Sequence, residues 1–303
     1  FANPWLAEQE DQARLDLAQL VAEGDRLAFS TDSYVIDPLF FPGGNIGKLA
    51  ICGTANDVAV SGAIPRYLSC GFILEEGLPM ETLKAVVTSM AETARTAGIA
   101  IVTGDTKVVQ RGAADKLFIN TAGMGAIPAN IHWGAQTLTA GDVLLVSGTL
   151  GDHGATILNL REQLGLDGEL VSDCAVLTPL IQTLRDIPGV KALRDATRGG
   201  VNAVVHEFAV ACGCGIEISE AALPVKPAVR GVCELLGLDA LNFANEGKLV
   251  IAVERNVAEQ VLAALHSHPL GKDAALIGEV VERKGVRLAG LYGVKRTLDL
   301  PHA

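Results

Sequence analysis

The sequence predicts an α/β protein, or an α+β protein with mixed sheets, that is divided into two domains. The first observation behind this prediction is that helical and strand periodicities alternate along both halves of the chain. The second is length, because 303 residues, of which 49% are hydrophobic, can fill two cores. The third is that the periodicity fades between residues 128 and 141. We therefore expect one domain over residues 1–130 and another over residues 140–303.

The first half alternates between strand and helix patterns. Apolar residues recur at intervals of three and four from Met80 to Ala97, which predicts an amphipathic helix that Gly98 is placed to end. The other expected elements are a strand over 26–35 that ends on Asp32, a helix from Ile46 that carries Asp57, a strand over 67–74, a strand over 99–103 that feeds Gly104 and Asp105 into a loop, and a buried strand over 117–127.

The second half restarts with a buried strand and continues with the same alternation. The expected elements are a strand over 142–147, a glycine-rich turn over 148–154, a helix from that turn through Leu160, helices over 174–185 and 200–212, and strands over 248–253 and 275–281. Gly213 or Gly215 is expected to end the helix that begins at Gly200. Both halves thus contain the elements of an α/β or α+β domain.

Composition excludes several classes of protein. A net charge of −11 argues against a nucleic-acid partner, which normally meets a basic face. Six cysteines in a chain of this length are too sparse for a secreted disulfide framework, so we expect reduced thiols. We find no membrane-spanning stretch and no secretion signal, and therefore expect a cytoplasmic protein. The chain begins at Phe1 without an initiator methionine, and we expect it to be a fragment of a longer protein.

Three aspartates in separate segments point to a divalent cation. Asp32, Asp57 and Asp105 each lie near an expected element end rather than in a surface run of charge. Convergence of carboxylates from different parts of a fold is what a hard cation requires. The alternative is that these are three unrelated helix caps or turn acids. The set as a whole favours the metal site.

Two further side chains are candidates for proton chemistry. Lys107 lies two residues after Asp105, so both would point to the same side of an extended segment. This lysine could neutralise phosphate charge or move a proton, or it could be a solvated loop lysine. Glu246, in the phrase Asn245-Glu246-Gly247 before an expected strand, could be a general base if it is buried, or an ordinary turn glutamate.

Two glycine-rich turns precede helices and could bind an anion through backbone N–H groups. The turn over 148–154 contains His153, which we expect to position other groups rather than to bind a metal. The stretch from Asp195 to Gly200 repeats the arrangement, with Arg194 and Arg198 beside its acid and its glycines. Tight strand-to-helix connections would explain the same glycines without a ligand.

The phrases at residues 29–33, 56–63, 104–109, 194–200 and 245–247 together resemble an ATP-dependent superfamily. It includes aminoimidazole ribonucleotide synthetase, selenophosphate synthetase and thiamine monophosphate kinase, and within it the chain is most similar to the carbamoyl dehydratases of hydrogenase maturation. The resemblance covers essentially the whole chain. It implies a PurM-like fold, in which the mixed N-terminal sheet pairs across a barrel-like homodimer and the C-terminal domain is an α/β sandwich.

The resemblance also implies the cofactors and the site. ATP would lie in clefts between domains, with Mg²⁺ on its phosphates held by Asp32, Asp57 and Asp105. The catalytic pair would be Glu246 and Lys107. The residues expected to contact the nucleotide are Asp32, Asn56, Gly104, Thr106, Gly148, Gly151, Asp152, Arg194, Asp195, Thr197 and Gly199.

The reaction that the resemblance implies starts from a carboxamide on the protein's own C-terminal cysteine, delivered by the carbamoyltransferase HypF. ATP would activate the amide oxygen as a phosphate ester. Loss of the amide protons and of phosphate would leave a thiocyanate. Its cyanide would pass through the HypC–HypD complex to the iron of a [NiFe] hydrogenase.

Two motifs of the family are missing from the 303 residues, namely an N-terminal His-Gly-Ser-Gly-Gly segment and a C-terminal Pro-Arg-Ile-Cys. We therefore expect this stretch to fold and dimerise without processing a substrate of its own. Two alternatives stay open. One is another ATP-dependent kinase or ligase of the superfamily, such as a thiamine monophosphate kinase or a selenophosphate synthetase-like enzyme. The other is a non-catalytic maturation scaffold.

Overall fold

The computed structural model describes every residue except 167–169, 291 and 301–303. The chain forms two compact units. The first unit contains Phe1–Ile131 and the short segment Cys174–Thr178, and the second contains His132–Asp173 and Pro179–Ala303. No described helix is long and apolar enough to cross a membrane. The mixed α/β architecture agrees with the predicted fold class.

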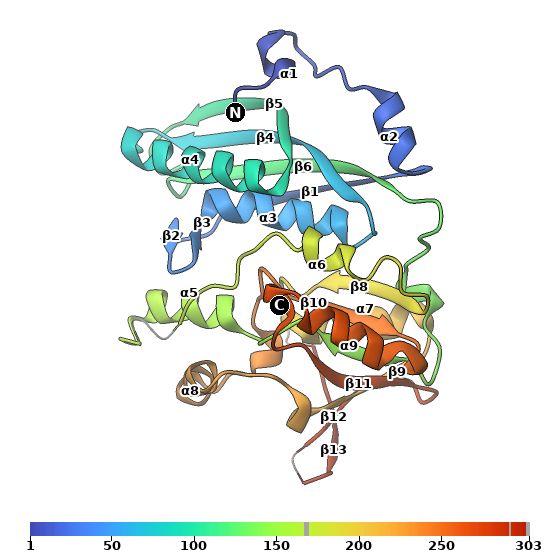
Figure 1. Cartoon of the computed structure of the whole chain (residues 1–303). Coiled ribbons are helices and arrows are strands. Elements are labelled where there is room, and N and C mark those ends of the chain that lie inside the picture. Colours follow the sequence, from blue (N-terminus) through green and yellow to red (C-terminus); the bar gives the residue numbers. More distant parts are fainter. Residues whose placement is uncertain (167–169, 291, 301–303) are drawn as a thin grey trace. The chain divides into compact units, whose positions relative to one another are not determined.

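The first unit is built on a four-stranded mixed sheet of order β1-β6-β4-β5 (Figure 1). The pairs β1/β6 and β6/β4 are antiparallel, and β4/β5 is parallel. The strands are β1 (Arg26–Tyr34), β4 (Ile64–Glu75), β5 (Ala100–Val109) and β6 (Leu117–Ile127), with a two-stranded ribbon of β2 (Phe40–Phe41) and β3 (Gly44–Asn45); the helices are α1 (Pro4–Ala7), α2 (Leu17–Glu23), α3 (Ile46–Ala59) and α4 (Met80–Ala97).

Helix α3 lies on one face of this sheet and packs against α4 (Figure 1). A chain of buried hydroxyl groups joins it to two strands. Thr54 Oγ1 lies 3.0 Å from Tyr34 Oη of β1 and 2.6 Å from Thr121 Oγ1 of β6. Thr121 in turn donates to the carbonyl oxygen of Ala50 at 2.9 Å. Because the buried hydroxyls satisfy one another, the helix is fixed in one rotation against the sheet.

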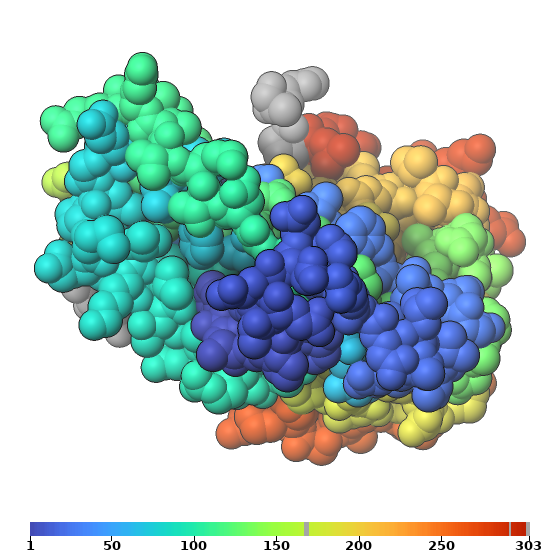
Figure 2. All heavy atoms as spheres, turned by 90° about the horizontal axis from the view of Figure 1, so that it is seen from above, coloured from blue at the N-terminus to red at the C-terminus, as the bar shows by residue number. Residues whose placement is uncertain are grey.

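The other face of the sheet is covered only in part. Leu20 of α2 packs there with Tyr67 of β4 and Val102 of β5, and Figure 2 looks down on this unit and shows the dark-blue N-terminal segment at its surface. Beyond that cover, Leu27, Phe29 and Ile73 are exposed. The first unit therefore carries an apolar surface on the face opposite α3.

The second unit is built on a seven-stranded sheet of order β13-β12-β9-β11-β7-β10-β8. Its pairs are antiparallel except β12/β9. The strands are β7 (Val143–Val146), β8 (Val190–Asp195), β9 (Gly215–Ser219), β10 (Leu249–Val253), β11 (Ala275–Val281), β12 (Gly285–Ala289) and β13 (Lys295–Thr297). The helices are α5 (Asp152–Glu162), α6 (Thr178–Gln182), α7 (Gly200–Cys212), α8 (Pro227–Leu236) and α9 (Ala258–His266), with short 3-10 turns η1 (Ala135–Thr137), η2 (Glu220–Ala222), η3 (Ala240–Asn242), η4 (Arg255–Val257) and η5 (Pro269–Gly271).

Helix α7 packs on this sheet through Val201, Val205 and Phe208, which join a core with Val146 and Val250. The central strands β7 and β10 are buried along their whole length. Both strands read as short apolar runs in the sequence, which is typical of strands covered on both faces. The core therefore surrounds the point where β7 leads into the glycine-rich turn.

Three predicted boundaries are wrong. β1 continues past Asp32 to Tyr34, so this aspartate lies within a strand. β5 runs from Ala100 to Val109, so Gly104 and Asp105 also lie in a strand rather than in a loop, since pairing with β4 holds them extended. The helix expected over residues 174–185 is only α6, because residues 174–177 form an extended segment that binds to α3.

The buried hydroxyl chain yields a test of the first unit. Replacing Thr54→Val keeps the side-chain shape but removes the buried hydroxyl that joins Tyr34 Oη to Thr121 Oγ1, so the free energy of unfolding should fall by about 1–3 kcal/mol. Chemical denaturation measures this change. The exposed Thr88→Val on α4 is the matched control and should change it by less than about 0.5 kcal/mol. Equal effects of the two substitutions would refute the role given to the hydroxyl chain.

Candidate functional site

A fully buried carboxamide joins three turns of the second unit. Asn245 Oδ1 accepts the N–H of Gly151 at 2.7 Å, and Nδ2 donates to the carbonyl oxygens of Ala196 and Phe243, each at 3.0 Å. The backbone N–H of Asn245 also donates to the Ala196 carbonyl oxygen at 2.9 Å. Both glycine-rich turns named above are thus tied to the segment that carries Glu246.

The turn after β7 needs glycine for two physical reasons. Gly151 caps α5 with φ of 82°, a left-handed conformation that side chains rarely adopt. A Cβ at Gly151 would also lie 2.9 Å from Val229 Cγ1, and one at Gly148 would lie 2.9 Å from Lys248 Cε. The positive φ and the contact with Val229 favour glycine at position 151. An α-helix leaves the N–H groups of its first turn without intrahelical acceptors, and in α5 the N–H of Gly154 donates instead to the Ala244 carbonyl oxygen at 2.9 Å.

Asp152 opens α5 and is buried. Its Oδ2 accepts Thr149 Oγ1 at 2.5 Å and pairs with Lys226 Nζ at 3.0 Å. The carboxylate is therefore committed to a hydroxyl and an ammonium inside the turn. Lys226 remains half exposed and adds positive charge beside a helix N-terminus, a combination that suits an anion.

Asp173 holds the backbone of the Glu246 segment. Its Oδ1 accepts the N–H of Glu246 at 3.1 Å, and its Oδ2 accepts the N–H of Gly247 at 3.1 Å and lies 3.3 Å from Lys248 Nζ. The Asp173 side chain is only 3% exposed. A buried carboxylate that receives three donors fixes the segment strongly, so the half-buried Glu246 is presented from a rigid backbone.

His153 lies next to this cluster and is buried. Its Nδ1 is 2.8 Å from Ser172 Oγ. Burial lowers the pKa of His153 from its ordinary value of 6.5 to about 4, against the opposing charge of Asp173 and with a small contribution from Arg161. A neutral imidazole with a hydroxyl partner fits the expected positioning role better than a role as a charged group.

The turn after β8 has the same form as the first turn. Asp195 ends the strand and is buried, and Gly199 caps α7 with φ of 72°. The carbonyl oxygen of Thr197 accepts the N–H of Gly200 at 2.9 Å. Arg194 is exposed and pairs with Glu207 of α7, so its guanidinium lies along the helix surface.

In the first unit, Asp32 and Asp57 lie on the same side of the sheet. Ser30 Oγ donates to Asp57 Oδ2 at 2.7 Å, which fixes that carboxylate of α3 against β1. Ser30 and Asp32 alternate along β1 and share the face that carries Tyr34, which packs on α3. Both carboxylates are half buried.

Asp105 lies elsewhere. The register aligns Asp32 with Thr121, Thr121 with Cys70, and Cys70 with Gly104 across the sheet. The two edge strands are therefore three strand spacings apart, about 14 Å. Asp105 follows Gly104 and so projects from the opposite face, where its side chain is 66% exposed. Among the described residues, no group of three His, Cys, Asp or Glu side chains could hold a metal ion.

Gly104, Thr106 and Lys107, which the sequence also predicts for the site, lie beside Asp105 on β5. Lys107 Nζ lies 2.9 Å from Asp105 Oδ2, and the N–H of Thr106 donates to Asp105 Oδ1 at 2.8 Å. The Lys107 hydrogen bond, followed by that of Thr106, holds the pKa of Asp105 below its usual range. Gly104 permits close strand contact, because its Cβ would lie 2.2 Å from the Cys70 carbonyl oxygen.

Asn56 is buried and serves the fold of the first unit. Its Nδ2 donates to the Ala175 carbonyl oxygen at 3.0 Å, and its Oδ1 accepts the N–H of Leu177 at 2.8 Å. The side chain thus holds the segment Cys174–Thr178. Its expected contact with a nucleotide stays a prediction.

The sequence alone does not single out Asp173 or Lys226, and it presents Asn245 only within the phrase Asn245-Glu246-Gly247. No local pattern marks Asp173, because its partners are more than seventy residues away. Lys226 precedes Pro227 at the start of α8 and reads as an ordinary helix boundary. Asn245 could have been found by asking which polar side chain in an apolar stretch must be buried and therefore hydrogen-bonded.

Two family models match the chain. Residues 9–127 match the model described as AIR synthase related protein, N-terminal domain, and residues 139–290 match the corresponding C-terminal domain. The chain is 98% identical over 303 residues to carbamoyl dehydratase HypE of Escherichia coli (strain K12), covering 100% of this chain and 90% of that protein. It is 50% identical over 294 residues to carbamoyl dehydratase HypE of Rhodobacter capsulatus, covering 96% and 86%.

Solved structures agree with these matches. A crystal structure of E. coli HypE superposes with a TM-score of 0.99 at 98% identity, covering 100% of this chain and 94% of that one. HypE in complex with ATP gives a TM-score of 0.94 at 46% identity, covering 99% and 91%. A HypE–HypF complex gives 0.89 at 46% identity, covering 99% and 96%.

The buried histidine predicts how stability depends on pH. The pKa of His153 is about 4 in the folded state and near 6.5 in the unfolded chain. This difference stabilises the folded state fully above about pH 6.5, and the stabilisation is lost as the pH falls toward 4. The expected loss is about 2–3 kcal/mol. Denaturation at pH 7 and pH 4 should show this loss in the parent protein and a smaller one in His153→Gln.

The exposed His132→Gln is the matched control and should keep the parental pH dependence. A pH dependence of His153→Gln equal to that of the parent would contradict the assignment. A loss seen equally in both variants would trace to another group.

Proposed function

The chain belongs to the HypE family of carbamoyl dehydratases, within the AIR synthase related proteins. From this premise we propose which residues carry out each step of an ATP-dependent dehydration in hydrogenase maturation. The observation that carries the activity is 98% identity along all 303 residues to a carbamoyl dehydratase. The buried cluster around Asn245 supports this proposal, since it ties two glycine-rich turns to the segment that carries Glu246.

We propose that the substrate is a carbamoyl group on a cysteine sulfur and that the product is a thiocyanate. The amide oxygen attacks the γ-phosphorus of ATP, one N–H proton leaves, and ADP departs. The second N–H proton and inorganic phosphate then leave, and the carbon–nitrogen bond becomes a nitrile. Phosphorylation is needed because an amide oxygen is otherwise a poor leaving group, and a base is needed because an amide N–H is weakly acidic.

Glu246 is the base that the geometry favours. Its backbone is held by Asp173, and the residue before it is held by its own buried carboxamide. A rigid, half-buried carboxylate can be kept within reach of a substrate proton. Lys107 is exposed and ion-paired with Asp105, so we assign it to neutralising phosphate charge rather than to removing a proton. Because it shares the face of Asp105 on β5, it would do so from a second copy of the chain.

We propose that backbone N–H groups at the starts of α5 and α7 hold the phosphates of ATP, with Lys226 adding charge. The two turns share one anchoring residue, and the ammonium of Lys226 lies 3.0 Å from Asp152 at the first of them. HypE in complex with ATP supports a nucleotide in this family. The other expected contacts, Arg194, Asp195, Thr197 and Gly199 among them, are kept as predictions.

The carboxylates of Asp32 and Asp57 fit Mg²⁺. This ion uses one or two carboxylates together with waters and substrate phosphates, so a preformed cluster of three ligands is not required. Bound there, Mg²⁺ would neutralise charge on the transferring phosphoryl group. Asp105, on the other face and at the other edge of the sheet, would reach that metal only from a second copy of the chain.

We propose that this second copy docks on the open face of the first sheet as a homodimer. Leu27, Phe29 and Ile73 leave an apolar surface there that a partner sheet would cover. The HypE–HypF complex supports HypF as the carbamoyl donor, and we propose the HypC–HypD complex as the acceptor. The six free cysteines support a reducing cytoplasm as the compartment.

The dehydration is tested in a chain that carries the substrate cysteine, supplied with carbamoyl donor and ATP. Mass spectrometry of the modified peptide should show addition of the carbamoyl group followed by loss of one water. Asp57→Asn should slow that loss by about hundredfold or more, because a metal-binding carboxylate is removed. The exposed Asp25→Asn should leave the rate unchanged.

A second variant separates the steps. Glu246→Gln should keep ATP binding but block the loss of water, because an amide side chain cannot take the proton. Normal water loss in Glu246→Gln would remove this residue from the mechanism. Normal loss in Asp57→Asn would remove the metal assignment, and no loss in the parent protein would overturn the dehydratase proposal.

A further inference from the structure

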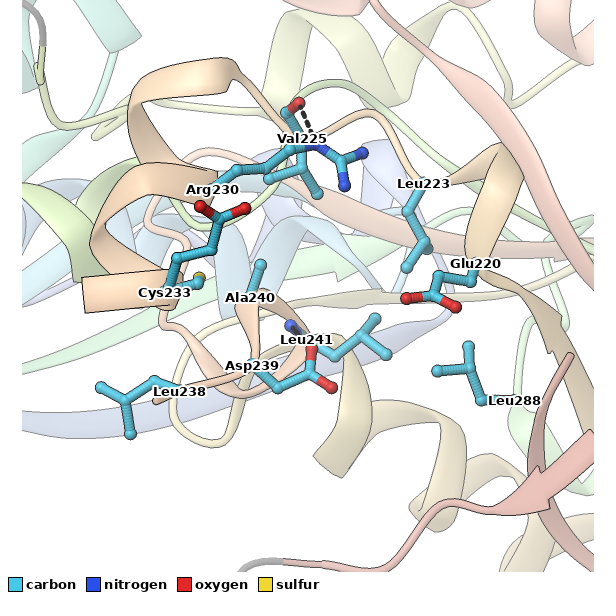
Figure 3. Close-up of a pocket in the computed structure, with 11 residues that line it drawn as sticks. Glu220, Leu223, Val225, Arg230, Cys233, Leu238, Asp239, Ala240, Leu241 and Leu288 are labelled. Carbon is cyan, nitrogen blue, oxygen red and sulfur yellow. Dashed lines mark hydrogen bonds between the residues drawn. The ribbon is translucent and has the colours of Figure 1, made fainter. Parts of the chain in front are cut away.

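A pocket of about 230 Å³ lies in the second unit, between η2, α8, η3 and β12 (Figure 3). Leu223, Leu241 and Leu288 form its apolar lining, and Cys233 of α8 contributes a thiol. None of the residues assigned above to ATP, metal or proton transfer lines it. The pocket is thus a separate feature that the dehydration does not use.

The charge of the pocket is negative. Three carboxylates line it, those of Glu220, Glu234 and Asp239, against one guanidinium, that of Arg230. Figure 3 shows the carboxylates of Glu220 and Asp239 turned toward each other across the pocket. The Glu220 and Glu234 side chains have no hydrogen bond or ion pair with any other described residue, and Asp239 pairs with Arg296 at 3.4 Å. The space between the carboxylates of Glu220 and Asp239 therefore suits a cation of opposite charge.

The size of the pocket limits what fits. Sites for drug-sized ligands enclose roughly 300–1,000 Å³, so 230 Å³ suits one or two side chains better than a whole nucleotide. A guanidinium on an aliphatic stem matches both the apolar lining and the facing carboxylates, since arginine buries its methylene groups and presents a planar fork of donors.

The surface around the pocket extends the apolar character. Leu235 in the last turn of α8 is exposed, as is Leu238, which follows the helix and lines the pocket. On the other side, Gly290 lies close to the pocket, since a Cβ there would be 3.4 Å from Glu220 Oε2. A small cationic ligand would leave these exposed leucines uncovered. A peptide segment with apolar residues on both sides of its cationic residue would bury them.

We propose that this pocket docks a partner protein through a segment in which an arginine stands between aliphatic residues. The arginine stem packs on Leu223, Leu241 and Leu288, and its guanidinium lies between Glu220 and Asp239. The net charge of −11 on the chain adds long-range attraction for a basic partner. The site is independent of the dehydration assigned above.

The test titrates the complete protein with acetyl-Leu-Arg-Leu-amide and with the matched acetyl-Leu-Gln-Leu-amide. The arginine peptide should bind at least about tenfold more tightly, and added salt should weaken it. It should also slow alkylation of Cys233, read by mass spectrometry, which locates binding in the pocket. Burial raises the pKa of the Cys233 thiol, so alkylation is run at alkaline pH.

Substitutions in the pocket test whether the carboxylates of Glu220 and Asp239 recognise the arginine. The double variant Glu220→Gln and Asp239→Asn should lose the tenfold preference and the protection of Cys233. Asparagine at 239 still accepts the N–H of Leu241, so the η3 turn is kept. The exposed Glu259→Gln on α9 is the matched control and should bind like the parent. Dehydration should be unchanged in all of them, which separates this site from the proposed function.

Four outcomes would overturn the proposal. They are equal binding of the two peptides, no protection of Cys233, binding of arginine ethyl ester as tight as that of the peptide, and loss of self-association in the double variant without loss of peptide binding. The third result would indicate a small-cation site, and the fourth an interface between copies of this chain.

Discussion

The buried carboxamide of Asn245 is the interaction on which the second unit's site depends. One side chain accepts from Gly151 and donates to Ala196 and Phe243, so it satisfies backbone groups of three separate turns at once. Unsatisfied buried amides and carbonyls are costly, and each of these turns therefore needs the others in place. The phosphate-binding geometry proposed here is a consequence of that shared requirement.

The buried charged groups near the site are also satisfied by partners within the turns. Asp152 and Asp173 are buried carboxylates, and each receives a lysine together with neutral donors. Paired in this way they stabilise turns rather than oppose an anion. Lys226 stays half exposed beside Asp152, and Glu246 follows Asn245 on the backbone that Asp173 holds. In the first unit, Asp32 and Asp57 are held on one side of the sheet, and Asp105 is held on the other.

Much of the fold could be predicted from the sequence. The helix from Met80 to Ala97 and the strands over 117–127 and 275–281 have the expected bounds, because their periodicity is regular and glycine or turn residues end them. The prediction failed at Gly104, where a glycine that usually marks a loop instead permits close contact between β4 and β5. It also failed at residues 174–177, where a tertiary contact with Asn56 replaces helix.

Residues of the candidate site could be predicted where they stand in a short local motif. They could not be predicted where their partners lie far away in the sequence. Gly151, Asp152 and Glu246 stand in recognisable phrases, and the structure gives each a physical setting. Asp173 and Lys226 act through partners far away in the sequence, and no spacing rule reaches them. The separation of Asp105 from Asp32 depends on strand order, which follows from the complete topology of the sheet.

The most direct measurement is amide hydrogen exchange at Gly151, whose N–H donates to the Asn245 side chain. In Asn245→Ala, protection at Gly151 should fall by about tenfold or more while the central strands β7 and β10 stay protected. The exposed Asn256→Ala should leave Gly151 unchanged. Unaltered protection at Gly151 in Asn245→Ala would contradict the claim that this carboxamide holds the site together.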